Sequence, residues 1–155
     1  MKILGKVSLS FAVRLLNDVL LVANILTLIF LPWVLQYIYD LMKTTYLFEE
    51  SYNFLLGFLY VAGVFTLLVL FVGHQIMRSL EKNLPFDPKN PRRFIFLALA
   101  FFLLSAAFFG KMLFYGTILT IFCAYLFLLL TLLSLILAEI FRQACKIWEE
   151  HQLTI

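Results

Sequence analysis

The stretch TILTIFCAYLFLLLTLLSLILA, residues 117–138, decides the fold of this chain, because it holds no charged residue and is long enough to cross a bilayer as a helix. Crossing about 30 Å of hydrocarbon takes roughly 20 apolar residues. Residues 19–38, 54–73 and 94–113 form three further apolar stretches of this kind. The sequence therefore predicts an all-α integral membrane protein in which four helices form a bundle.

The composition supports the same class of protein. Apolar residues make up 64% of the chain and charged residues only 14%. A soluble domain of this length could not bury so much Phe, Leu and Ile in one core. The connections are short, so residues 1–155 are expected to form a single four-span domain. Residues 1–18 would form an interfacial lead-in, and residues 139–155 a helical tail.

Basic residues indicate the orientation, because loops rich in Lys and Arg stay in the cytoplasm. They gather before the first span, between the second and third spans, and after the fourth, as Lys2, Lys6 and Arg14, then Arg78, Lys82, Lys89, Arg92 and Arg93, then Arg142 and Lys146. The other two connections hold only Lys43 and Lys111. We therefore expect a multi-pass protein of the cell membrane with both the N- and C-termini in the cytoplasm.

Several function classes find no support in the sequence. Nothing resembles a set of nucleophile, base and oxyanion donors, and His74 and His151 lack metal-ligand spacing, so we expect no enzyme, no cofactor and no metal. We interpret His74 as marking the inner end of the second span. The net charge of +3 is explained by the inward-facing Lys and Arg, so no direct nucleic-acid binding is expected. We expect the lipid bilayer to surround the protein.

Charged and polar groups near the spans have an ordinary structural interpretation. Asp18 and Arg14 share a helical face beside the first span and are expected to form an interfacial pair, the alternative being a proton or cation relay. Glu139 has Arg142 and Gln143 within one turn as partners. The deeper polar groups are expected to help the helices pack, and they are Asn24, Thr66, Ser105, Thr120 and Tyr125.

The loop LPFDPKNPRR, residues 84–93, is stiff and non-helical in pattern because it repeats proline. Asp87 followed by Pro88 is typical of a helix start, and Asn90 followed by Pro91 is a second candidate. One interpretation folds the loop back under the bundle as a cytoplasmic site, and the alternative is a turn that enters the third span. The candidate site residues are Pro85, Phe86, Asp87, Pro88, Asn90, Arg92 and Arg93.

The tail keeps an apolar stripe at helical spacing while its other face becomes charged. The fourth span is expected to continue as one helix to about residue 150, well beyond the hydrocarbon core. The stripe could pack on the loop, lie on the membrane surface or receive a partner. For the last case the candidate docking residues are Glu139, Phe141, Arg142, Trp148, Glu149 and Glu150.

The loop and tail together resemble a family of small four-helix bacterial integral membrane proteins, known only as a domain of unknown function. The matching residues are Pro85, Phe86, Asp87, Pro88 and Asn90 in the loop, and Leu137, Ala138, Glu139, Phe141, Arg142, Glu149, Glu150, Leu153, Thr154 and Ile155 in the tail. The chain departs from the family pattern at Leu84, where Gly is common, and at Lys89 and Pro91.

The resemblance implies a protein of the bacterial inner membrane whose gene lies beside one for a small helix-turn-helix regulator. The leading hypothesis is therefore a membrane-embedded regulatory or sensory protein whose loop and tail bind and sequester that cytoplasmic transcription regulator. Two alternatives stay open. One is a small transporter or exporter that works as a homo-oligomer, and the other is an immunity-type membrane-protection protein.

Overall fold

Four α-helices make up nearly all of the computed structural model, which describes residues 9–43, 51–81 and 89–153. They are α1 (Leu9–Lys43), α2 (Tyr52–Glu81), α3 (Lys89–Phe114) and α4 (Ile118–Leu153), and these ranges contain no strand. All four helices are long and apolar enough to cross a membrane. The predicted all-α membrane fold with four helices is thereby confirmed.

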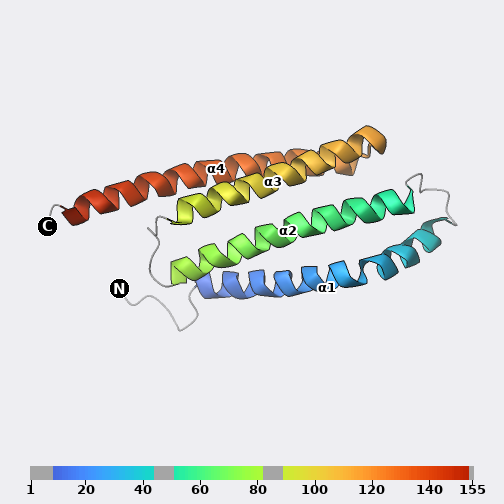
Figure 1. Cartoon of the computed structure of the whole chain (residues 1–155), viewed down its shortest axis with the longest axis horizontal. Helices are drawn as coiled ribbons and strands as arrows, with labels where there is room; N and C mark the ends of the chain where they lie inside the picture. The colour runs from blue at the N-terminus through green and yellow to red at the C-terminus, as the bar shows by residue number, and fades with distance from the viewer. Residues whose placement is uncertain (1–8, 44–50, 82–88, 154–155) are drawn as a thin grey trace.

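The helices pack in chain order as an open row (Figure 1). Helix α1 lies against α2, α2 against α3 and α3 against α4, while the described part of α1 contacts neither α3 nor α4. Much of α1 therefore faces outward, and Trp33 is 75% exposed. In a membrane this apolar surface is covered by lipid, which is as apolar as the side chains themselves.

The row has two distinct ends. The start of α1, the end of α2, the start of α3 and the end of α4 lie at one end of the molecule, the terminal end (Figure 1). The end of α1, the start of α2 and the short α3–α4 connection lie at the opposite end. The start of α1 and the end of α4 therefore lie at the same end of the molecule, as four helices of alternating direction require.

Local hydrogen bonds explain where two of the helices begin. The carbonyl of Ser51 accepts the N–H of Leu55 at 3.0 Å, and serine is a favoured residue before a helix. The hydroxyl of Thr117 accepts the N–H of Thr120 at 3.3 Å and so caps α4. The connection at residues 115–117 is too short for any arrangement but an antiparallel α3–α4 pair.

Helices α3 and α4 approach closely because small residues lie between them. Ala124 is fully buried, and the Ser105 hydroxyl donates a hydrogen bond to its carbonyl oxygen at 2.9 Å. In α2, the hydroxyl of Thr66 donates to the carbonyl of Ala62 at 2.9 Å. Ser105 therefore joins two helices and Thr66 satisfies its hydroxyl within its own helix, as the packing interpretation of these residues predicted.

Helix α1 bends in its second half, the half that contains Pro32 (Figure 1). Proline removes one backbone donor and is the usual cause of such a bend. The Tyr52 hydroxyl donates to the Pro32 carbonyl at 3.2 Å, and the Tyr52 ring packs edge-on against Tyr39. Tyr52 thus joins the start of α2 to the bent part of α1.

Candidate functional site

A cluster of apolar side chains lies near the terminal end of α2, α3 and α4. Its buried members are Ile76, Phe94 and Ala138, with Phe141 and Leu80 among the side chains packed around them. In the sequence, the apolar stretches reach this end at residues 73, 94 and 138. Since the cluster joins the three helices here, these ends of the apolar stretches lie at a similar depth along the helices. Polar side chains follow between this depth and the terminal end.

The first polar group joins α1 to α2. A carboxylate oxygen of Asp18 lies 2.6 Å from Nδ1 of His74, and the two side chains are 40% and 30% exposed. One residue earlier, the Asn17 amide donates to the Leu70 carbonyl at 2.9 Å. A Cβ at Gly73 would lie 3.0 Å from Oδ1 of Asn17, so glycine leaves room for this close approach.

Sequence reasoning missed the Asp18–His74 contact. It gave Asp18 a partner on its own helix, Arg14, whose guanidinium lies 5.5 Å from the centre of the Phe11 ring. A usable signal was present, because Asp18 and His74 directly flank the apolar stretches 19–38 and 54–73. Two antiparallel spans of similar length bring such flanking residues opposite each other.

The carboxylate–imidazole pair can hold α1 against α2, because its two side chains come from different helices. Within residues 9–43, 51–81 and 89–153, no three His, Cys, Asp or Glu side chains gather where they could hold a metal ion. Asp18 and His74 belong to different helices and meet at the edge of the apolar stretches. The Asp18–His74 pair can therefore act as an interhelical clamp, a contact that joins α1 to α2.

We expect replacement of Asp18 and His74 by Ala, singly and together, to give non-additive losses of stability. The coupling should be about 0.5–1 kcal/mol, because both groups are partly exposed and water screens the pair. The free energy of unfolding in mixed micelles measures it. A cycle that combines Asp18→Ala with Tyr60→Ala, an exposed position near the other end of α2, should be additive. Additive losses in the Asp18–His74 cycle would refute the clamp.

The second polar group lies at the start of α3. Asn90 is fully buried, and its side-chain oxygen accepts a hydrogen bond from Nη1 of Arg93 at 2.9 Å. Arg92 is exposed. Helix α3 begins at Lys89, so Asn90 lies inside the first turn instead of preceding the helix as the second candidate start required. Four predicted loop residues lie outside the described ranges, namely Pro85, Phe86, Asp87 and Pro88.

The third polar group belongs to α4. Arg142 and Gln143 donate hydrogen bonds to Glu139, each at 3.0 Å, so the expected local partners of this carboxylate are confirmed. The Phe141 ring stacks on Phe94 of α3 with ring centres 5.0 Å apart. Phe141 therefore belongs to the internal packing, whereas Glu139 and Arg142 face outward.

Beyond this contact α4 continues past the start of α3 (Figure 1). Cys145 is still buried, but Ile147 and Trp148 are 56% and 50% exposed, and Glu149 and Glu150 are exposed as well. The structure thus packs one predicted tail residue, Phe141, against α3, while the side chains of Trp148, Glu149 and Glu150 are exposed.

The fold defines a small multi-pass α-helical membrane protein, and the side-chain contacts of Asp18, Asn90 and Glu139 described above lie towards its terminal end. Residues 26–155 match the model of a family described as Protein of unknown function (DUF2975), and the chain belongs to that family. No curated protein and no solved structure matches the chain. The matched range includes His74, the start of α3 and the whole of α4, and it begins after Asp18.

Proposed function

We propose that this chain is a membrane-embedded regulatory or sensory protein whose terminal end faces the cytoplasm of a bacterial cell. In this proposal residues 139–153 of α4, the α4 extension, bind a small helix-turn-helix transcription regulator and hold it at the inner membrane. The observation that carries the proposal is the exposure of Ile147 and Trp148 on a helix that continues past the start of α3.

The charges of the α4 extension favour a protein partner over the lipid surface. Glu139, Glu149 and Glu150 are interspersed with Arg142 and Lys146. A helix that binds anionic lipid alone carries mainly Lys and Arg on its polar face. A mixed face next to an exposed Trp is instead typical of a helix that docks into a groove of another protein.

The distribution of ionisable residues favours regulation over transport. The apolar stretches 19–38, 54–73 and 117–138 hold no charged residue, and 94–113 holds only Lys111, close to its end. Ion and proton paths through membranes are marked by ionisable groups within the spans. Asp18 and His74 flank the spans, where they hold two helices together.

We expect Trp148→Ala to weaken binding of the regulator about tenfold or more, because a Trp at the centre of an interface is often worth about 2 kcal/mol. The measurement is the dissociation constant between the purified, detergent-solubilised protein and the helix-turn-helix protein that this proposal expects to be encoded beside the gene. Trp33→Ala is the matched control, since Trp33 is the same residue type and is even more exposed, at 75% against 50%, but lies on α1. Equal dissociation constants for Trp148→Ala and the unmodified protein would refute docking through this helix.

A further inference from the structure

The amide of Asn24 lies within the apolar part of α1. Asp18 flanks the stretch 19–38, and Asn24 follows it along the helix by about 9 Å, at 1.5 Å per residue. Since the hydrocarbon core is about 30 Å thick, this position lies well inside it. The side chain of asparagine is too short to return its amide to the headgroups, as the long side chain of lysine does.

The Asn24 amide makes no hydrogen bond to the part of the chain that the structure describes. Its neighbours on the same side of α1 meet α2, because Asn17 donates to a carbonyl of that helix and Leu28 packs against Gly63. On α2 between these two contacts, the Thr66 hydroxyl donates within its own helix. An unpaired amide at this depth is costly, because lipid chains offer neither a donor nor an acceptor.

Asn24 is half-buried and borders an exposed face of α1. Residues three and four apart share a helical face, and Leu20, Ala23, Thr27 and Val34 are exposed on this one. The Thr27 hydroxyl donates to the Ala23 carbonyl at 2.8 Å, so it is satisfied within α1. Because Ala23 and Thr27 are small, the backbone of another helix can approach closely here. The described parts of α3 and α4 do not contact α1.

We propose that a second copy of the chain packs on this face, with the two α1 helices related by a two-fold axis and their Asn24 amides hydrogen-bonded to each other. An amide is both a donor and an acceptor, so it is complementary to itself. A two-fold axis along the membrane normal brings the same group from each copy together at one depth. Asparagine is among the side chains that join helices in this way within a membrane.

The proposed dimer is separate from the proposed function. Helices α1 and α4 lie at opposite edges of the row, so pairing through α1 leaves the α4 extension uncovered (Figure 1). Loss of the dimer and loss of the regulator are therefore distinguishable results.

Fluorescence energy transfer between donor- and acceptor-labelled full-length chains in lipid vesicles measures the dissociation constant of the dimer. Asn24→Leu should weaken the dimer about tenfold, because it removes the amide pair and keeps a side chain of similar size. Asn24→Gln retains an amide and should retain most of the affinity. Gln36→Leu is the control, since it removes an exposed amide near the other end of the apolar stretch. Equal weakening by Gln36→Leu would overturn the proposal.

Disulfide formation between single cysteines in the membrane tests the face directly and leaves Asn24 in place. After Cys123→Ala and Cys145→Ala, Thr27→Cys should form a disulfide-linked dimer on oxidation. Ile29→Cys should not, because Ile29 is exposed on the opposite side of α1. Equal crosslinking at the two positions, a Thr27→Cys adduct with a different protein, or a dissociation constant unchanged by Asn24→Leu would overturn the proposal.

Discussion

Ala124→Phe is expected to lower the free energy of unfolding by about 3 kcal/mol, the upper part of the range for overpacked cores. Ala124 is fully buried where α3 and α4 meet, and its carbonyl accepts the hydrogen bond from Ser105. A ring at this position would push the helices apart and break that bond. Because lipid solvates apolar side chains as well as protein does, close packing and hydrogen bonds have to hold such helices together.

Unfolding in mixed micelles measures the loss. Ala106→Phe is the control, since it adds the same ring to an exposed position on α3 and should change the free energy of unfolding by less than about 0.5 kcal/mol. Equal effects of the two substitutions would show that α3 and α4 do not approach closely at Ala124.

The second large effect is expected for Phe94→Ala, with a loss of about 3 kcal/mol, the lower end of the range for removing a buried Phe. Phe94 is buried in the cluster that joins α2, α3 and α4, and its ring stacks on Phe141. Its removal would leave a cavity at the base of the α4 extension. Hydrogen exchange should accordingly speed up around Phe141 more than in the middle of α4.

Phe96→Ala is the matched control for this substitution. Phe96 is 63% exposed and faces away from the cluster, so in a micelle it exchanges one apolar contact for another and should lose little stability. A Phe94→Ala protein as stable as Phe96→Ala would mean that the α4 extension is not anchored through α3.

Much of the fold could be predicted from single residues and patterns. The apolar stretches locate the four helices, Thr117 marks the start of α4, and the continuing stripe through Phe141 and Ile147 indicates a helix longer than the membrane requires. Hydrogen bonding of Glu139 to Arg142 and Gln143 also follows from spacing, because residues three and four apart share a helical face. These features are local in sequence, which is why the sequence reveals them.

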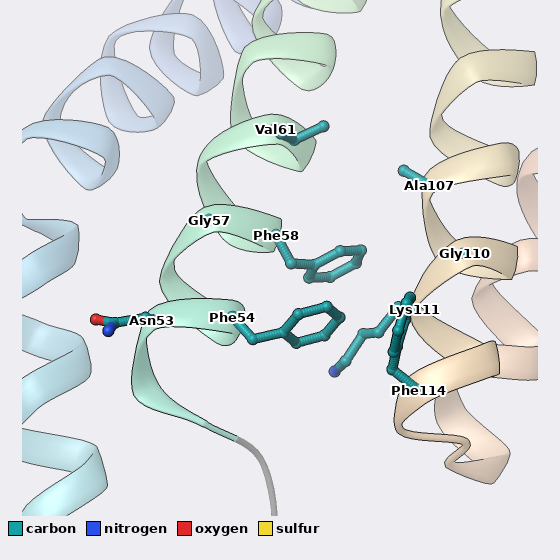
Figure 2. Close-up of a pocket in the computed structure, with 9 residues that line it drawn as sticks. All are labelled: Asn53, Phe54, Gly57, Phe58, Val61, Ala107, Gly110, Lys111 and Phe114. Carbon is teal, nitrogen blue, oxygen red and sulfur yellow. The ribbon is translucent and has the colours of Figure 1, made fainter.

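Features that depend on how helices face each other could not be predicted in the same way. The Asp18–His74 contact joins residues far apart in the chain. Their positions beside two apolar stretches suggest a similar depth, but no local pattern shows which faces of α1 and α2 meet. The open row, in which α1 touches only α2 among the described helices, depends on which apolar face meets which. A groove between α2 and α3, lined by Gly57, Gly110 and Lys111 among others (Figure 2), depends on the separation of these two helices.

Site-specific photo-crosslinking in living cells tests the central claim most directly. A benzoylphenylalanine at Ile147 is expected to crosslink to a small helix-turn-helix protein of the cytoplasm, identified by mass spectrometry. The same probe at Ile136, an equally exposed position within the apolar stretch of α4, should capture no soluble protein. Crosslinks from Ile147 only to lipid, to other copies of this chain or to proteins on the far side of the membrane would contradict the proposed docking role.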